Sequence, residues 1–277
     1  MTVARTPAAA SFIAAAFFLN GCTSTAPTTS VTPAPAPVVH EKHWGYVADA
    51  ETSGPAEWGS RPGNAACAAG KRQSPIDLAT RAPFPVDAKD LPNLVFRYGT
   101  TKLHLVNSGL TVQADVDKGS TVEIEGLAWP LVQFHFHMPS EHSLDGLHYP
   151  MEMHLVHVAP DGKPGLVVGV FLVQGGDTPA LAPIFASLPK GKGAKKDDTA
   201  VTIDLAKLLP ESRAYLAYEG SLTTPPCTEG IRWYVLRTPA GITGEQLGAF
   251  VSLPRMTPTN RPVQPLAGRK VLLDTTP

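Results

Sequence analysis

Two histidines, His135 and His137, lie two positions apart in the segment LVQFHFHMPSEH, which runs from residue 131 to residue 142. Side chains two positions apart in a β-strand point to the same face, so both imidazoles could reach one ion without a bend in the backbone. Gln133 shares this face, whereas the two phenylalanines point the other way. Such a pair also arises by chance on a half-polar sheet face, so a metal site requires a third ligand.

A second apolar run, MEMHLVHVA, offers two further histidines. His154 and His157 are three positions apart and face opposite ways on a regular strand, so only one can join the site. Glu152 shares a face with His154, and a metal-binding histidine usually donates its other N–H to a carboxylate or similar acceptor. We therefore predict His154 as the third ligand, with Glu152 as its hydrogen-bond partner. By the same argument Gln133 would support His135, and His157 would be structural.

Three imidazoles without a thiolate or carboxylate suit Zn²⁺ and leave a fourth coordination position for water. Structural zinc sites are usually closed by four protein ligands, so a site with three histidines indicates catalysis. The charge of the ion would turn its bound water into a nucleophile near neutral pH. The sequence therefore predicts a catalytic zinc centre.

The segments that must position these residues have the periodicity of strands. Runs rich in β-branched and aromatic residues, bounded by Gly, Pro, Asp or Asn, cover residues 103–116, 120–138, 151–159, 166–174 and 232–239. Helical patterns are short and cover residues 177–188, 205–210 and 243–250. Because strands dominate and the helices do not alternate with them regularly, we predict a mainly β single domain with a large, mostly antiparallel sheet.

The first 21 residues have the pattern of a secretion signal, with Arg5 before an apolar run and small residues leading to Cys22. The segment LNGC resembles the lipobox of bacterial lipoproteins, whose cysteine is acylated, although Asn20 is large for that position. Residues 22–39 are rich in Thr, Pro and Ala and are predicted to form a tether. We expect a periplasmic domain at 40–277, anchored to a membrane through a lipid on Cys22.

The composition limits the partners and the cysteine chemistry. A formal net charge of −1 gives no electrostatic reason to expect nucleic-acid binding. The chain has three cysteines. If Cys22 is acylated, Cys67 and Cys227 remain as one pair in an oxidising compartment, where a disulfide can persist. Two separate buried thiols are the alternative.

Six motifs, in this order, resemble the alpha-class carbonic anhydrases. They are HWGY (His43–Tyr46), QSPIDL (Gln73–Leu78), QFHFHMPSEH, EMHLVH, GSLTTPPCTEG (Gly220–Gly230) and NRPVQPL (Asn260–Leu266). The resemblance implies a central, mainly antiparallel twisted sheet of about ten strands with short peripheral helices. It also implies zinc-dependent, reversible hydration of carbon dioxide to bicarbonate and a proton by a zinc-bound hydroxide.

The resemblance assigns roles to individual residues. His135, His137 and His154 match the zinc ligands. Thr223 matches a threonine whose hydroxyl accepts a hydrogen bond from the zinc-bound hydroxide and donates one to a glutamate, which is Glu141 here. An ionised carboxylate can only accept, so it would fix the direction of that hydroxyl. The other matched positions are the site hydroxyl Thr224, the apolar wall for the substrate at Val156, Val167, Leu222 and Trp233, and the disulfide of bacterial members at Cys67 and Cys227.

One position departs from the family pattern. Many active members carry N-N-G-H before the site, and this histidine transfers the product proton to solvent. The matching stretch here is VNSGLTV, which places Leu110 at that position. Leucine cannot accept a proton, so proton release would depend on buffer, ordered water or another group such as His43 or Tyr46. The alternative interpretation is a weak or inactive carbonic-anhydrase-like lipoprotein that acts as a binding module. A homodimer is left open.

Overall fold

The fold is built on one twisted sheet. The computed structural model describes residues 42–80, 86–87 and 91–274. The predicted signal, the tether and Cys22 lie outside these residues, and the proposed domain boundaries stay a prediction. Within the described residues no helix is long and apolar enough to cross a membrane.

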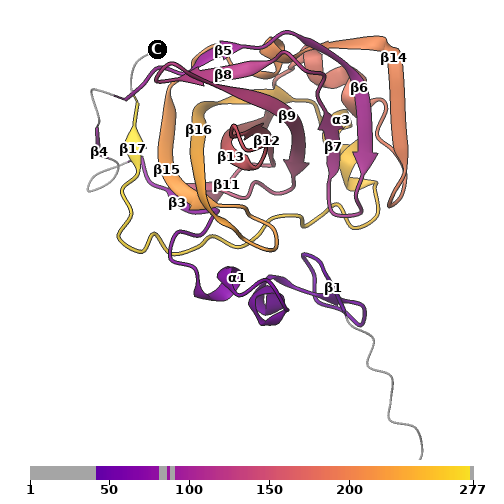
Figure 1. The fold of residues 1–277 in the computed structure, drawn as a ribbon. Helices are drawn as coiled ribbons and strands as arrows, with labels where there is room; N and C mark the ends of the chain where they lie inside the picture. The colour runs from indigo at the N-terminus through magenta and orange to yellow at the C-terminus, as the bar shows by residue number, and fades with distance from the viewer. Residues whose placement is uncertain (1–41, 81–85, 88–90, 275–277) are drawn as a thin grey trace, which may run out of the picture. The chain divides into compact units, whose positions relative to one another are not determined.

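Twelve strands among the described residues form this sheet, with the main order β14-β6-β7-β9-β12-β13-β16-β15-β17-β4; β8 pairs with β9, and β5 pairs with β8 (Figure 1). Their bounds are β4 Val86–Asp87, β5 Val95–Arg97, β6 Thr100–Asn107, β7 Val112–Asp115, β8 Thr121–Ile124, β9 Leu127–His137, β12 Met151–Val158, β13 Pro164–Gln174, β14 Lys195–Asp204, β15 Tyr215–Ser221, β16 Glu229–Ile242 and β17 Leu272–Leu273. The pairs β13–β16 and β17–β4 are parallel, and the other pairs are antiparallel. The predicted mainly β, mostly antiparallel fold is confirmed.

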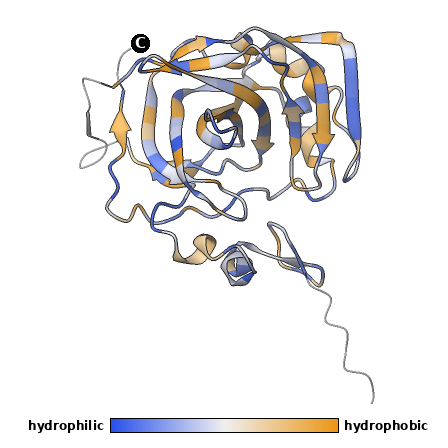
Figure 2. Cartoon of the chain, viewed as in Figure 1, coloured by the Kyte–Doolittle hydropathy of each residue, from blue (hydrophilic) through white to orange (hydrophobic). Residues whose placement is uncertain are grey.

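The two faces of the sheet carry different side chains. Phe134 and Phe136 of β9 and Leu155 of β12 are buried in the main hydrophobic core on one face. The alternate residues of the same strands point to the other face, which a second apolar cluster covers in part. In Figure 2 the central strands show orange bands that alternate with pale and blue ones, whereas the edge strand β14 has a continuous blue stretch. This alternation explains how apolar strands can present histidines on one side.

Two of the predicted runs are hairpins and not single strands. The run 103–116 turns at Ser108–Thr111, where Gly109 adopts φ +81° between β6 and β7. The run 120–138 turns at Glu125 and Gly126, which have φ of 53° and 77°, between β8 and β9. A positive φ is costly for most residues and easy for glycine. The glycines inside these runs therefore mark turns that the apolar periodicity alone does not reveal.

Small elements surround the sheet. The helical patterns form the 3₁₀ turns η2 (Pro179–Leu181) and η3 (Leu205–Leu208) and the helices α2 (Ala182–Phe185) and α3 (Gly244–Val251). The remaining pieces are β1 (His43–Trp44), β2 (Thr52–Ser53), η1 (Pro55–Ser60), α1 (Ala66–Ala69), β3 (Asp77–Leu78), β10 (Ser143–Leu144) and β11 (Leu147–His148). A capping box between Thr243 and Gln246 begins α3. The predicted helical segments are thus confirmed, and they are short.

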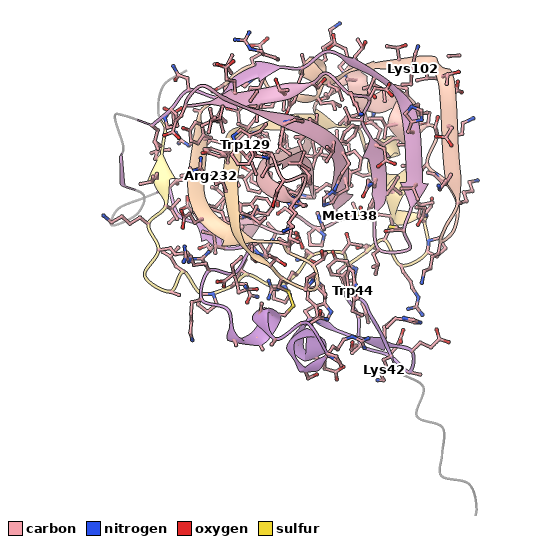
Figure 3. The ribbon with its side chains drawn as sticks, in the orientation of Figure 1. Lys42, Trp44, Lys102, Trp129, Met138 and Arg232 are labelled. Carbon is pink, nitrogen blue, oxygen red and sulfur yellow. A yellow bond between two sulfur atoms is a disulfide. The ribbon has the colours of Figure 1, made fainter. Side chains whose placement is uncertain are left out.

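The disulfide joins the segment before β3 to the loop between β15 and β16. Cys67 and Cys227 are bonded, with a sequence separation of 160 residues. The bond is drawn in yellow beside α1 in Figure 3. Trp44, Tyr46 and Trp58 pack around it in a small hydrophobic cluster. The pairing expected from the cysteine count is confirmed, and the alternative of two separate thiols is wrong.

Candidate metal centre

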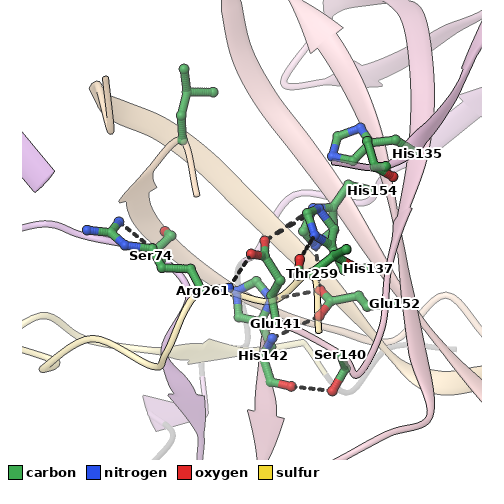
Figure 4. Close-up of polar contacts among 12 residues, drawn as sticks. Ser74, His135, His137, Ser140, Glu141, His142, Glu152, His154, Thr259 and Arg261 are labelled. Carbon is green, nitrogen blue, oxygen red and sulfur yellow. Dashed lines mark hydrogen bonds and ion pairs between the residues drawn. The ribbon is translucent and has the colours of Figure 1, made fainter. Parts of the chain in front are cut away.

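The pairing of β9 with β12 brings three imidazoles together. In this antiparallel register His154 lies opposite His135, and Glu152 lies opposite His137. The ring centroids are 5.0 Å apart for His135 and His137, 4.6 Å for His137 and His154, and 5.4 Å for His135 and His154. One nitrogen from each ring lies within 4.8 Å of the other two (Figure 4). The three histidines singled out by strand periodicity therefore converge on one point.

Each imidazole is oriented by an acceptor on its other ring nitrogen. His135 Nδ1 lies 2.8 Å from Gln133 Oε1, His154 Nε2 lies 2.8 Å from Glu152 Oε1, and His137 Nδ1 lies 2.6 Å from the carbonyl oxygen of Thr259. An oxygen of this kind can only accept, so each of these nitrogens must carry the proton. The lone pairs of His135 Nε2, His137 Nε2 and His154 Nδ1 are then free for a metal ion.

The site fits the donor set that Zn²⁺ prefers. The Nε2 atom of His137 is buried and has no hydrogen-bond partner among the described residues. A buried nitrogen without a partner is costly, and a metal ion at the point of convergence would satisfy it. Burial lowers the pKa of His135 and of His137, which favours the neutral, ligating form. The residues that the structure brings together are therefore suited to zinc.

A buried carboxylate supports the third ligand. Burial acts to lower the pKa of His154, but the adjacent Glu152 outweighs it and the pKa is raised. Burial alone would raise the pKa of Glu152, yet the facing His142 and His154 hold it well below its ordinary value. His142 could suggest a second metal cluster with Glu152 and His154. However, its Nδ1 contacts Glu152 Oε1 at 2.7 Å and its Nε2 contacts the Tyr218 hydroxyl at 2.7 Å, so this group is a hydrogen-bond network.

Glu141 is fully buried beside the triad. Its Oε1 accepts a hydrogen bond from the backbone N–H of Arg261 at 2.8 Å. Its Oε2 has no hydrogen-bond partner among the described residues and lies 3.5 Å from His137 Nε2 and 3.8 Å from His154 Nδ1. Thr223 is also buried, but no hydrogen bond joins it to Glu141 within the described part of the chain. The relay between these two residues stays a prediction.

The residues predicted to form the substrate wall lie together next to the site. Val156, Val167 and Trp233 are buried in the second apolar cluster, and Leu222 packs against it. The ring centroid of Trp233 is 4.8 Å from that of His154. Thr224 is half-buried in the following turn, where its carbonyl accepts the N–H of Cys227 at 2.8 Å. The apolar members of this set therefore form one surface beside the third ligand of the triad.

Leu110 lies at the turn between β6 and β7 and lines a cavity of about 570 Å³. His43 and Tyr46 line the same cavity. The ring centroid of Tyr46 is 6.3 Å from that of His137, so one lining residue of the cavity lies next to the triad. The structure thus gathers Leu110 and the two alternative groups named for proton release around one space.

Three residues of the site escaped the sequence analysis: His142, which contacts Glu152, and Thr259 and Arg261, which act through backbone atoms. Thr259 orients His137 through its backbone carbonyl, which no side-chain pattern could reveal. Its hydroxyl also accepts the N–H of Met138 at 2.9 Å and so holds this loop against the end of β9. Arg261 contacts Glu141 through its backbone amide. Its place in the motif NRPVQPL was the only available signal.

Comparisons with known proteins agree with this site. The family model of the eukaryotic-type carbonic anhydrases matches residues 53–275. A carbonic anhydrase of Nostoc sp. is 40% identical over 232 residues, covering 83% of this chain and 85% of that protein. A carbonic anhydrase of Pectobacterium carotovorum is 36% identical over 259 residues, covering 93% of this chain and 97% of that protein. The alpha-carbonic anhydrase of Thermovibrio ammonificans, solved with the inhibitor sulfanilamide, is 39% identical with a TM-score of 0.74, covering 84% of this chain and 100% of that one.

The matched region contains all three histidines of the triad and extends over most of the chain. The sheet, the convergent imidazoles and these relatives lead to one assignment. The chain belongs to the alpha class of carbonic anhydrases.

Proposed function

We propose that His135, His137 and His154 bind Zn²⁺ and that the chain catalyses the reversible hydration of carbon dioxide to bicarbonate and a proton. The observation that carries this proposal is the set of three free ring nitrogens, each fixed by an acceptor on the opposite side of its ring. When bound, Zn²⁺ would act as a Lewis acid and make water nucleophilic near neutral pH. A preoriented ligand set lets the ion bind without rearrangement of the strands.

The protein groups around the triad would divide between substrate binding and orientation. Val156, Val167, Leu222 and Trp233 offer an apolar surface for the linear, uncharged carbon dioxide. The Glu141 carboxylate, when ionised, can only accept hydrogen bonds. A Thr223 hydroxyl that donates to Glu141 therefore directs its lone pair toward the nucleophile, and Thr224 adds a second hydroxyl at the same edge.

Proton release is the step for which this chain differs from many relatives. Leu110 offers no acceptor, so the product proton must leave through buffer, ordered water or a group at the cavity such as His43 or Tyr46. Burial raises the pKa of Tyr46 well above its ordinary value, which makes that hydroxyl hard to ionise. Of these two side chains, His43 is the better acceptor, because a neutral imidazole has a nitrogen lone pair that can take up a proton.

We further propose that the enzyme is exported to the periplasm and anchored through a lipid on Cys22. The disulfide between Cys67 and Cys227 supports an oxidising compartment. Palmitate labelling of the full chain, with Cys22→Ser as the control, tests the anchor.

The central test is a carbon dioxide hydration assay on protein of measured zinc content. The parent should lose activity when a chelator removes the metal and regain it with added Zn²⁺. His137→Ala should bind zinc poorly and hydrate at the rate of the buffer alone. A parent that is fully loaded with zinc and still inactive would reject catalysis and favour a binding module of the same fold.

A further inference from the structure

Arg261 is a buried cation held by oxygen atoms of uncharged groups. Its side chain is 2% exposed and packs over the Trp58 ring at 5.8 Å. Its Nη1 donates to Gln73 Oε1 at 2.9 Å and to the Ser74 carbonyl at 2.7 Å, and its Nη2 donates to the Cys67 carbonyl at 2.9 Å. The planar guanidinium fork matches such divergent acceptors, and an ammonium does not. The side chain is therefore fixed in direction as well as in place.

The backbone of the same residue holds Glu141. The Arg261 N–H donates to Glu141 Oε1 at 2.8 Å, and it is the one hydrogen-bond donor to this carboxylate among the described residues (Figure 4). The second carboxylate oxygen points at the metal-facing nitrogens of His137 and His154. Rotation of the carboxylate is thus limited at one oxygen by Arg261, and the other oxygen faces the triad.

Hydrogen bonds also connect Arg261 to both cysteines of the disulfide. The Cys67 carbonyl accepts from Arg261, and Gln73, which also accepts from Arg261, donates its Nε2 to the Cys227 carbonyl at 3.1 Å. Backbone oxygens of both bonded cysteines therefore belong to the network that fixes Arg261. A contiguous set of buried hydrogen bonds joins the disulfide to the carboxylate beside the triad.

We propose that Arg261 is a positioning residue, which uses its guanidinium contacts near the disulfide to hold its own amide against Glu141 and thereby sets the orientation of that carboxylate at the metal site. The proposal rests on the proposed function for its kinetic consequence. The effect of Arg261 on the geometry of the metal site does not depend on that function. If Arg261 only stabilised the fold, its effect on the metal site would not depend on Glu141.

The test is a double-mutant cycle. Arg261→Lys keeps the charge but cannot make all three side-chain contacts, and Glu141→Gln removes the carboxylate on which Arg261 is proposed to act. At full zinc occupancy, Arg261→Lys should lower kcat/KM on the order of tenfold in the parent and less than about twofold in the Glu141→Gln background. Equal losses in the two backgrounds would overturn the proposal, because they would mean that Arg261 does not act through Glu141.

Arg269→Lys is the matched control. Arg269 also donates to several backbone carbonyls, including that of Gln73, and it packs over the Tyr218 ring at 5.5 Å. It has no contact with Glu141 among the described residues. Its substitution should change thermal stability as Arg261→Lys does, but with the same effect on kcat/KM in both backgrounds.

A second readout separates this proposal from the proposed function. With Co²⁺ in place of zinc, Arg261→Lys should shift the visible absorption spectrum of the bound ion in the parent but not in the Glu141→Gln background. A parent that binds Co²⁺ and Zn²⁺ without hydrating carbon dioxide would reject the enzymatic function and leave the spectral cycle as the test of Arg261. Spectra that shift equally in both backgrounds would reject the positioning role.

Discussion

A single oxygen atom of Glu152 serves two histidines: Oε1 lies 2.8 Å from Nε2 of His154 and 2.7 Å from Nδ1 of His142. The second oxygen accepts the backbone N–H of His142 at 2.8 Å. All three residues are buried. Glu152 thus fixes the ring of a candidate metal ligand while His142 fixes Glu152, and the metal site includes a layer of groups that would not touch the ion.

We expect Glu152→Gln to weaken zinc binding by about 10- to 100-fold, because an amide is a weaker acceptor and no longer fixes the protonated nitrogen of His154. Competition with a fluorescent chelator measures this affinity. Glu123→Gln, which removes a carboxylate paired with Arg97 on β5, controls for loss of charge. Unchanged affinity in Glu152→Gln would show that Glu152 does not support the ligand.

The buried His157 should make the folded state less stable as the pH falls. Burial lowers the pKa of His157 from 6.5 to about 3, and its Nε2 lies 2.7 Å from the Tyr98 hydroxyl. The folded state then binds fewer protons than the unfolded state between these two values, so this residue lowers stability as the pH falls from 6.5 to about 3. We expect His157→Gln to reduce the slope of unfolding free energy against pH in that window by up to about 1.4 kcal/mol per pH unit.

Denaturant titrations from pH 4 to pH 8 test this, and comparison with the parent cancels the contribution of the metal-site histidines. His104→Gln is a control, because the contribution of His104 to stability should change with pH in the opposite direction. A hydrogen bond to Asp197 raises the pKa of His104, so its contribution is present at low pH and is lost as the pH rises through the raised pKa. Parallel pH profiles for His157→Gln and the parent would contradict the buried, neutral state of His157.

Strand periodicity was sufficient to identify the triad and two of its three supporting groups. Because side chains alternate along any strand, His135 and Gln133, or His154 and Glu152, share a face whatever the rest of the fold does. The same rule placed His157 on the opposite face, where its ring stacks on Tyr98 with centroids 6.0 Å apart. These relationships are local, and local geometry is what a sequence pattern encodes.

The remaining parts of the site depend on contacts between distant segments. The Thr259 carbonyl and the Arg261 amide reach His137 and Glu141 across 122 and 120 residues, and both are backbone atoms without a side-chain signature. The turns inside the runs 103–116 and 120–138 were missed for a related reason. Their flanking strands continue the apolar pattern, which is interrupted only by the short turns that contain Gly109 and Gly126.

Loss of the disulfide should lower stability by about 2–5 kcal/mol, because it would release a long loop in the unfolded chain. The bond closes a sequence separation of 160 residues. Cys67→Ser combined with Cys227→Ser, compared with the oxidised parent in urea, measures the difference. The double variant in the presence and absence of reductant is the control and should not respond. If reduction leaves the parent equally stable, the bond contributes nothing to the fold.

The buffer dependence of turnover tests the consequence of Leu110. In the parent, kcat should rise with imidazole concentration, because no side chain at position 110 accepts the product proton. Leu110→His should raise kcat at low buffer on the order of tenfold or more and make it less dependent on imidazole, because a histidine beside the cavity supplies that acceptor. Stopped-flow measurements of carbon dioxide hydration at several imidazole concentrations provide the comparison.

Leu110→Ala controls for the change in cavity size, and it should remain buffer-dependent. His43→Ala in the parent separates the two internal sources of an acceptor. If His43 takes part, the variant should turn over more slowly at low buffer and recover at high imidazole, since the external base replaces it. Equal, buffer-independent rates in the parent and in Leu110→His would mean that proton release does not limit turnover and that the leucine carries no kinetic cost.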